Sequence, residues 1–427
     1  MTRMATIAAT APRGGFHDGD WVESKDQDPD GDIRLLQLAD VGDGKFKDKS
    51  DRWINEETFR RLRCSWVHPG DILIARMPDP LGRACVVPEG LGKTITVVDV
   101  AVLRPDPDQA DAGYLTYAIN SAKTRSEVER QQDGATRQRI PRKRLGRVSI
   151  PLPPLEEQRR IADFLDAETT QIDALIAEQE RLIGLLKERR ASGILQAVTR
   201  GLRDVDLKPS TLTWVDAVPL HWTVANIRRF AAMKTGHTPS RSNPEYWVDT
   251  HIPWFTLADV WQVRDGRRTH LGETENTISD LGLANSAAEL LPAGTVVLSR
   301  TASVGFSGVM PRPMATSQDF WNWVCGPELV PEYLMYLFRA MRGEFNALMI
   351  GSTHKTIYQP VAAAIRVPVP PLEEQHEIVA RIDERTRKTD ALINEAEHNI
   401  ALSKERRAAL ITAAVTGQID VTTGGSA

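Results

Sequence analysis

The chain has 427 residues, 41% of them hydrophobic and 26% charged, which is the composition of a folded soluble protein with two or three domains. No apolar run approaches the ~20 residues of a membrane-spanning helix, residues 1–15 lack a signal-peptide core, and three widely spaced cysteines argue against disulfides or a zinc site, so we expect a cytoplasmic protein. The net charge of −4 means that any binding to nucleic acid must rest on local basic patches.

Residues 1–150 are predicted to form a first globular domain of mixed α and β structure. Residues 16–63 are acidic and rich in turn-forming residues. Beyond them, short apolar runs alternate with Gly, Pro and Asp, which indicates a twisted sheet connected by loops. The predicted strands are Ile33–Leu38, Asp71–Arg76, Ala84–Val87 and Thr94–Leu103, and the predicted helix is Tyr114–Gln131.

The end of this domain carries a concentration of positive charge. Residues 113–147 hold nine Lys and Arg but only three Asp and Glu. Each of these residues taken alone is as easily explained by a solvated surface. As a set they are suggestive of phosphate contacts, which give salt-dependent affinity and position a protein on nucleic acid without reading sequence.

Residues 151–199 are predicted to form a long helix, and residues 368–416 repeat it 217 positions later without a gap. More than half of the aligned positions are identical, which marks a duplicated architecture. Both copies open with Pro-Pro-Leu-Glu-Glu-Gln, where the prolines favour an extended start and the acids suit the positive end of the helix dipole. Neither helix has an internal proline, and a helix of about 45 residues would be roughly 65 Å long.

Apolar residues recur at steps of three, four and seven along both helices, which is the pattern of a coiled-coil seam. Two ordinary amphipathic helices packed on local cores are the alternative, but such helices usually run about 8–20 residues. We therefore expect the two helices to pair antiparallel, with pseudo-twofold symmetry. The residues predicted to pair the helices are Ile161, Leu165, Ile172, Leu175, Leu182, Leu186, Ile378, Ile382, Leu392, Ile393, Ile400 and Ile411.

Residues 209–367 form the second predicted domain, a diverged copy of the first. Gly70–Arg76 matches Gly294–Arg300, and Gly134–Thr136 matches Gly351–Thr353. Trp254, Trp261, Trp321 and Trp323 stand at strand-like positions and are predicted to be core residues. The predicted boundaries are 1–150 for the first domain, 151–208 for the first long helix and its linker (Arg203–Ser210 reads as linker), 209–367 for the second domain, and 368–427 for the second helix and tail.

This organisation resembles the specificity subunit of type I restriction-modification systems over nearly the whole chain. The resemblance rests on PLPPLEEQ and PVPPLEEQ at the start of the long helices, KERR within them, and AVTRGL and AVTGQID at their ends. The second domain adds Val218–Trp222, Lys234–Ser240 and Ile252–Thr256. The first domain departs from the pattern, because it has no counterpart of the VPLHW motif at Val218–Trp222.

The resemblance implies an α+β fold in which two diverged target-recognition domains are held apart by two long antiparallel coiled-coil helices. Each domain would read one half of an interrupted double-stranded DNA target. The helices would set the spacing and dock methyltransferase subunits, two per chain, and restriction or translocase subunits would join the complex. The chain would hold no cofactor itself, because S-adenosylmethionine, ATP and Mg are expected on the partner subunits.

Three fragments resemble catalytic motifs, but each lacks a required residue. Gly92–Thr94 looks like the end of a phosphate-binding loop, yet the glycine needed five positions earlier is Val87. His376 begins a zinc-protease pattern, yet the second histidine position is Ala380. Asn243–Tyr246 has glutamate where the amino-methyltransferase motif has its second proline. We therefore predict a non-catalytic chain without a metal site.

Base reading requires Arg, Lys, Gln, Asn, Ser or Thr side chains that reach the groove edges of DNA. The DNA-binding candidates of the first domain are Arg76, Arg137, Gln138, Arg139 and Lys143. Those of the second domain are Lys234, Thr238, Ser240, Arg241, Arg300, Thr301, Ser317, Gln318, His354 and Lys355. The alternative function is a structural adaptor that joins two partner proteins through the helices without DNA, and a free-standing nuclease or methyltransferase is third.

Overall fold

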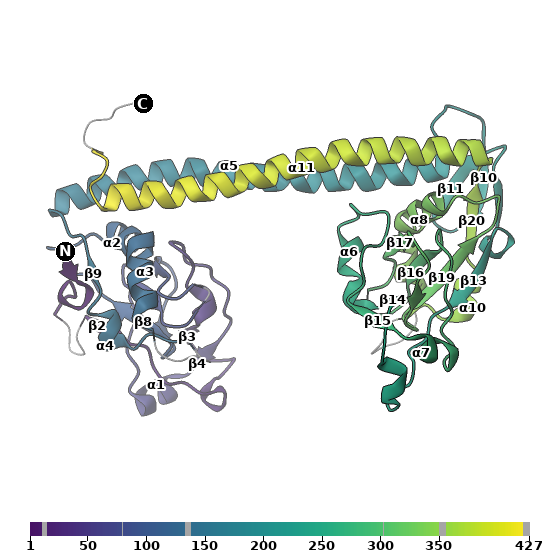
Figure 1. Cartoon of the computed structure of the whole chain (residues 1–427). Helices are drawn as coiled ribbons and strands as arrows, with labels where there is room; N and C mark the ends of the chain where they lie inside the picture. Colours follow the sequence, from purple (N-terminus) through teal and green to yellow (C-terminus); the bar gives the residue numbers. More distant parts are fainter. Residues whose placement is uncertain (11–14, 79, 133–137, 302, 350–355, 422–427) are drawn as a thin grey trace. The chain divides into compact units, whose positions relative to one another are not determined.

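A computed structural model of the chain describes residues 1–10, 15–78, 80–132, 138–301, 303–349 and 356–421. The chain divides into two compact units: unit 1 is Met1–Gln179 with His398–Ala427, and unit 2 is Glu180–Glu397. The division passes through both long helices, so each unit contains a globular part and a segment of each helix. The predicted α+β fold with two diverged domains and two long helices is confirmed (Figure 1).

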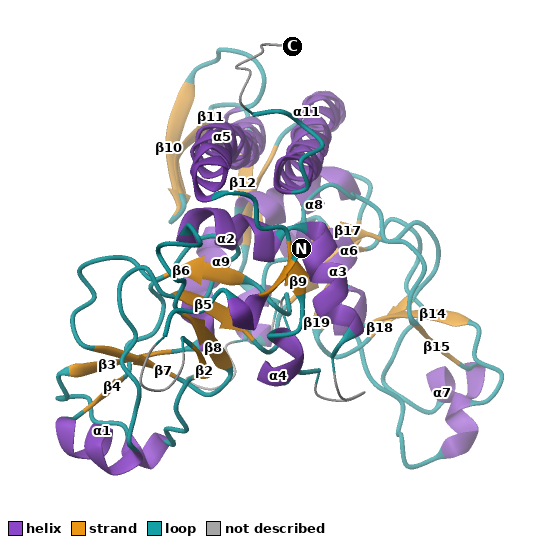
Figure 2. Cartoon of the chain, turned by 90° about the vertical axis from the view of Figure 1, so that its left-hand side faces the viewer, coloured by secondary structure: helices purple, strands orange, loops and turns teal. Residues whose placement is uncertain are grey.

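The two long helices are α5 (Leu155–Arg200, 46 residues) and α11 (Leu372–Val415, 44 residues). They lie side by side in Figures 1 and 2. In unit 1, Leu165 of α5 and Ile411 of α11 belong to one buried cluster, and Arg407 Nε lies 3.0 Å from Asp173 Oδ1. In unit 2, Arg190 Nη1 lies 2.7 Å from Asp390 Oδ1. Low numbers on α5 meet high numbers on α11, so the segments run antiparallel in each unit.

The predicted seam is partly buried. Leu165 and Ile378 are fully buried, but Leu175, Leu182 and Leu392 are 50%, 40% and 50% exposed. The other buried residues of the seam are Ile161, Ile172, Leu186, Ile382, Ile393 and Ile411, and Ile400 is half-buried. Two helices can cover only one face of each other, so an apolar stripe wider than that face leaves leucines at the surface.

Unit 1 is built on a four-stranded antiparallel sheet of order β2-β8-β5-β6 and a three-stranded sheet of order β4-β3-β7. The strands β3 and β7 run parallel, and the pair β1–β9 lies apart from both sheets. The strands are β1 (Thr2–Arg3), β2 (Phe16–Asp18), β3 (Ile33–Leu36), β4 (Trp53–Ile54), β5 (Ile72–Ala75), β6 (Ala84–Val86), β7 (Thr94–Thr96), β8 (Val100–Leu103) and β9 (Ser149–Ile150). The helices are α1 (Glu56–Leu62), α2 (Ala112–Asn120), α3 (Ala122–Arg130) and α4 (Arg142–Leu145).

Unit 2 repeats this plan. Its sheets have the orders β13-β19-β16-β17 and β15-β14-β18, β14 and β18 run parallel, and β12 pairs with β20. The strands are β10 (Leu207–Leu212), β11 (Val215–Pro219), β12 (Thr223–Asn226), β13 (Ala231–Thr235), β14 (Ile252–Phe255), β15 (Asn276–Ile278), β16 (Val296–Ser299), β17 (Ser307–Val309), β18 (Ala315–Thr316), β19 (Phe320–Cys325) and β20 (Arg366–Val369). The helices are α6 (Trp261–Arg264), α7 (Asp280–Ala284), α8 (Pro331–Ala340), α9 (Arg342–Leu348) and α10 (Gln359–Ala363).

The N-terminal edge of unit 1 is completed by the first residues of the chain. Thr2 pairs with Ile150, as Thr223 pairs with Val369 in unit 2. The β10–β11 hairpin of unit 2 has no counterpart among the described residues of unit 1. The segment Arg203–Ser210 was predicted to be a linker, but its second half belongs to strand β10. The predicted helix Tyr114–Gln131 is split into α2 and α3, because Ser121 ends one helix and caps the next.

The glutamine of the repeated Glu-Glu-Gln motif joins each globular part to its long helix. Gln158 is buried, accepts from Asp111 N at 3.0 Å and donates to the carbonyls of Gln109 and Pro153. In unit 2, Gln375 is equally buried and binds Val330 N at 2.8 Å and two carbonyls.

Two tyrosines in each unit add to this junction. Tyr114 donates to Pro151 O at 3.1 Å, and Tyr333 donates to Pro368 O at 2.9 Å. Tyr117 donates to Asp166 at 2.6 Å, and burial together with this carboxylate raises the pKa of Tyr117 to about 12. Tyr336 makes the same bond to Asp383 in unit 2. These paired polar groups hold α2 and α8 against the start of the long helix in each unit.

Candidate nucleic-acid interface

In unit 2 the main sheet presents one polar end, where β13 and β16 finish and β19 begins. The loop after β13 contains Thr238, whose Oγ1 lies 2.6 Å from Oε1 of Gln318. Gly236 makes this approach possible, because a Cβ there would lie 2.2 Å from the Ser317 carbonyl oxygen. Three of the predicted residues, Thr238, Ser317 and Gln318, are thereby brought together.

Asp319 organises the same end of the sheet. Its carboxylate accepts from Thr301 Oγ1 at 2.7 Å and from Ser317 Oγ at 2.9 Å, and its carbonyl accepts from the backbone N–H of Arg300 at 2.9 Å. Asp319 is not among the residues predicted from the sequence. The available signal was a carboxylate directly before a strand and among candidate hydroxyl side chains.

Arg300 stands over the ring of Trp321, with its Cζ 4.4 Å from the ring centroid. Burial lowers the pKa of Arg300, and its Nε has no hydrogen-bond partner among the described residues. A guanidinium stacked on an aromatic ring keeps its N–H groups in a plane parallel to the ring. From there they can donate to a base edge or a phosphate.

Three further candidates of unit 2 have partners of their own. Lys234 pairs with Glu289 at 2.7 Å, Ser240 contacts Ser242 at 2.8 Å, and Arg241 lies over Trp247 at 5.9 Å. His354 and Lys355 lie outside the described residues. The next residue along, Thr356, donates to the Arg300 carbonyl at 2.9 Å.

In unit 1 the corresponding end of the sheet holds a network of arginines and aspartates. Arg76 pairs with Asp18, Arg142 Nε lies 3.2 Å from Asp18, and Arg139 lies 3.3 Å from Asp99. Arg76 follows β5 and Asp99 precedes β8, as Arg300 follows β16 and Asp319 precedes β19. In both units this end of the sheet is therefore formed by equivalent strands. The arginine and the aspartate recur, but the side chains around them differ.

Arg76 is buried, at 6% exposure, and its guanidinium donates to Val98 O at 3.0 Å and Ile140 O at 3.1 Å as well as to Asp18. Its position indicates a structural role in holding the 138–142 segment. Gln138 and the neighbouring Lys143 are exposed, and Arg139 is half-exposed. Arg137 lies outside the described residues. Sequence analysis did not identify the roles of Asp18 and Asp99.

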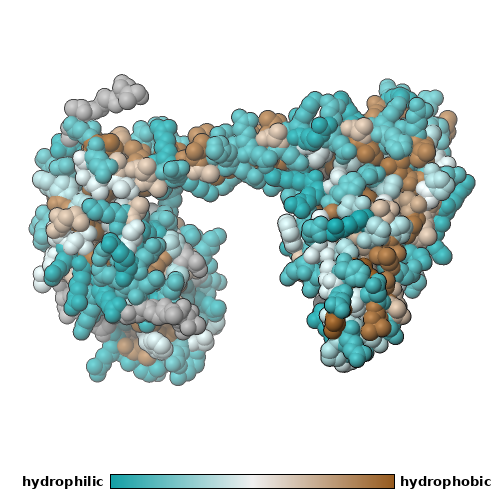
Figure 3. Space-filling model, in the orientation of Figure 1, coloured by the Kyte–Doolittle hydropathy of each residue, from teal (hydrophilic) through white to brown (hydrophobic). Residues whose placement is uncertain are grey.

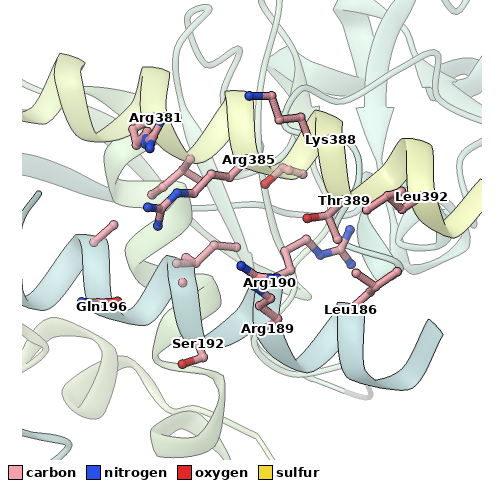
Figure 4. Close-up of a pocket in the computed structure, with 15 residues that line it drawn as sticks. Leu186, Arg189, Arg190, Ser192, Gln196, Arg381, Arg385, Lys388, Thr389 and Leu392 are labelled. Carbon is pink, nitrogen blue, oxygen red and sulfur yellow. The ribbon is translucent and has the colours of Figure 1, made fainter. Parts of the chain in front are cut away.

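A groove of about 630 Å³ lies between α5 and α11 within unit 2 (Figure 4). Its floor is apolar, with Ile194 and Ile382, and its walls are basic. The basic residues are Arg189, Arg190, Arg381, Arg385 and Lys388. Its form reflects divergence within the helix repeat, because Gly193 and Arg381 occupy the positions that Leu410 and Phe164 occupy in the other copy. Leu410 and Phe164 pack against the core of unit 1.

The visible face of unit 1 is predominantly hydrophilic, with scattered hydrophobic residues (Figure 3). Among the described residues no group of three or more His, Cys, Asp or Glu side chains could hold a metal ion. No helix in the described part of the chain is long and apolar enough to cross a membrane.

The family model for the type I restriction modification DNA specificity domain matches residues 36–183 and again residues 219–401. These two matches cover well over half of the chain. The chain belongs to this family. Each match includes one globular part and most of the following long helix, so the family unit coincides with the internal repeat.

Individual relatives agree with this assignment. The EcoKI specificity subunit of Escherichia coli K12 is 22% identical over 405 residues, covering 91% of this chain and 82% of the relative. The MjaIX specificity subunit of Methanocaldococcus jannaschii is 28% identical over 168 residues, but this match covers only 39% of this chain and 38% of the relative.

Solved structures share the fold. A chain from a study of complex assembly and conformational transition in a type I R-M system superposes with a TM-score of 0.74, at 18% identity, over 98% of this chain and 97% of that chain. The HsdS subunit from Thermoanaerobacter tengcongensis superposes with a TM-score of 0.51 at 17% identity, over 98% of this chain and 96% of that chain.

Proposed function

We propose that this chain is the DNA-recognition subunit of a type I restriction-modification complex, and that each unit reads one half of an interrupted target. The observation that carries this proposal is the duplicated sheet end. Arg76 and Arg300, like Asp99 and Asp319, occupy equivalent places after and before equivalent strands, whereas the surrounding side chains differ. One scaffold with two different sets of polar groups is what two different half-sequences require.

Base reading in unit 2 falls to side chains that the scaffold leaves exposed or half-exposed. Gln318 can bind adenine through its amide, and Arg300 can donate to guanine from its stacked position. In unit 1, base reading and phosphate contact fall to Gln138, Arg139 and Lys143. The buried Arg76 holds this segment in place through its bond to the Ile140 carbonyl.

The long helices would set the distance between the two half-sites and dock the methyltransferase subunits, two per chain. Support comes from the exposed leucines Leu175, Leu182 and Leu392 and from the basic groove of unit 2, because apolar residues with charged surroundings suit an amphipathic partner helix. Restriction or translocase subunits would join through that complex.

Catalysis would belong to the partners. The incomplete motifs at Gly92–Thr94, His376 and Asn243–Tyr246 supply no phosphate cradle, zinc pair or amino-methyltransferase signature. S-adenosylmethionine, ATP and Mg would therefore be held by the partner subunits.

Sequencing of methylated positions in a cell that contains the chain and its methyltransferase tests the proposal. The expected result is one asymmetric target, two short sequences separated by a fixed number of unspecified base pairs, that disappears when the gene for this chain is deleted. A protein-only adaptor would leave no such pattern. It would also give no duplex-DNA retention that weakens with salt, which a DNA reader must show.

A further inference from the structure

A buried aspartate closes a loop at the same place in both units. The sequence Leu-Ala-Asp-Val occurs at 38–41 and again at 257–260. Asp40 is fully buried and accepts from the backbone N–H groups of Gln37 and Lys49, both at 2.7 Å. Asp259 is 1% exposed and accepts from Thr256 N at 2.9 Å and Glu275 N at 2.7 Å. We call the enclosed segments, 41–49 and 260–274, the anchored loops.

Each anchored loop is also tied to a long helix at equivalent aspartates. In unit 1, Lys45 Nζ lies 2.6 Å from Asp173. In unit 2, Arg190 donates to the Asp265 carbonyl at 2.6 Å, and the same arginine pairs with Asp390, the repeat equivalent of Asp173. Arg267 adds bonds from the loop to α11, including Asn394 at 2.8 Å. Each loop is thus closed at its ends by a buried aspartate and held to the long helix at its middle.

The tethers use only some of the cations of the loops. Arg264 and Arg268 in unit 2, and Lys47 and Lys49 in unit 1, are exposed. None of these four has an ion pair among the described residues. Arg268 lies over the ring of Trp261 at 5.4 Å, and Trp261 is 59% exposed, contrary to its predicted place in the core. The ring holds the guanidinium in position and leaves its N–H groups free to donate.

In unit 2 the anchored loop adjoins the base-reading end of the sheet. Arg264 Nη2 lies 3.3 Å from Ser303 Oγ, two residues beyond Thr301. The loop also follows the edge strand β17, because Val309 and the loop residues Thr269 and Leu271 exchange backbone hydrogen bonds. Figure 1 shows α6, the start of this loop, beside β17.

We propose that the anchored loops are DNA-backbone clamps: in each unit their free cations bind phosphates beside the half-site without reading bases. This rests on the proposed function and adds residues that do not read sequence. The two loops differ in sequence and length. What they share is the buried aspartate that closes them and two positive charges without an ion pair among the described residues. Phosphate contact requires that charge, whereas a shared protein partner would require a shared shape.

The test uses the full-length chain, the duplex with its methylated target and a scrambled duplex, with fluorescence anisotropy across a potassium chloride series. Arg264→Ala with Arg268→Ala should weaken binding to both duplexes by the same factor, roughly ten- to fifty-fold near 0.1 M salt. The slope of log affinity against log salt should fall by up to about two. Lys47→Ala with Lys49→Ala should do the same independently.

Two further variants serve as controls. Arg264→Lys with Arg268→Lys keeps both charges and should bind within about threefold of the unaltered chain, because phosphate contact depends on charge more than on the guanidinium shape. Lys187→Ala with Arg387→Ala removes two exposed cations of the long helices in the same unit, neither of which lines the basic groove, and should leave the salt slope unchanged.

Three results would overturn the clamp. They are unaltered affinity and slope in the alanine variants, a changed preference between the two duplexes, and lost methyltransferase binding with DNA affinity intact, which would make the loops a protein contact. If the unaltered chain itself shows no salt-dependent DNA binding, the proposed function fails together with the clamp. If the unaltered chain binds DNA in a salt-dependent way and the alanine variants bind just as it does, the clamp alone fails.

Discussion

At the scale of single residues, the two sheet ends show how one position can serve two purposes. Arg76 and Arg300 follow equivalent strands, yet Arg76 is buried with three acceptors while Arg300 is stacked on Trp321 with Nε unpaired among the described residues. A buried, fully bonded arginine cannot turn toward a ligand without leaving carbonyls and a carboxylate unpaired. We therefore expect Arg300, not Arg76, to contact DNA.

Arg300→Ala should weaken binding to the methylated duplex by about 1–3 kcal/mol and relax the base preference at one position of the unit 2 half-site. Competition binding with duplexes altered one base pair at a time measures both effects. The matched control is Arg312→Ala, an exposed arginine of the same unit that pairs with Glu273. A uniform loss across all duplexes would show that Arg300 contacts phosphate, not bases.

Gln375→Leu should lower the free energy of unfolding by about 2–4 kcal/mol, because it leaves a buried N–H and two carbonyls without their partner. Gln158→Leu should have a similar effect in unit 1. Denaturant unfolding followed by circular dichroism measures the change. The exposed Gln171→Leu on α5 serves as control and should change the stability by less than about 0.5 kcal/mol.

Residue types that suit DNA contact could be identified from the sequence, but the surroundings of each residue depend on neighbours that only the fold brings together. Thr238, Ser317 and Gln318 do converge. Asp99 and Asp319 were missed because an aspartate before a strand resembles an ordinary turn residue until its partners are known. Trp261 was assigned to the core because large rings are usually buried, but its position on the anchored loop exposes it.

At the scale of elements, the long helices were predictable and the connections were not. A proline-free stripe repeated at one fixed offset leaves few alternatives to a long helix, and both helices extend as expected. The β10–β11 hairpin was not expected within the linker, since none of the residues Leu207–Leu212 of β10 is buried and they carry no core pattern. The break between α2 and α3 depends on one capping serine.

Insertion of Ala-Glu-Ala-Lys after Glu180 tests whether the helices act as a ruler. Four residues add about 6 Å of helix and a rotation of roughly 40° beyond one turn. The spacer in the methylated target should lengthen by one or two base pairs, at about 3.4 Å per step, while both half-sequences stay the same. A folded, active variant that still methylates the original spacer would disprove the ruler, whereas complete loss of methylation would indicate that the mismatched seam no longer holds.

Charge reversal tests the basic groove of unit 2 as a docking surface. Arg381→Glu with Arg385→Glu should reduce affinity for the methyltransferase subunit by about tenfold or more, because an acidic partner helix would meet like charge. Sedimentation velocity of mixtures measures assembly. Arg406→Glu, an exposed substitution on the α11 segment of unit 1, is the control, and equal loss in both variants would point to a general charge effect.

At the scale of the whole molecule, the chain shows duplication followed by unequal divergence. The long helices keep their motifs, the buried glutamine and the aspartate–arginine pairs in both copies. The sheet ends keep their topology and change their side chains. This pattern of divergence is expected of a protein in which one helical scaffold carries two recognition domains and each domain reads a different sequence.

The most direct test of this central claim is to exchange residues 209–367 for the matching domain of another family member and to sequence methylated positions in the host. The account predicts that one half of the methylated sequence changes, while the other half is retained unchanged. A folded, active chimera in which both halves change, or neither does, would contradict the assignment of one half-site to each unit.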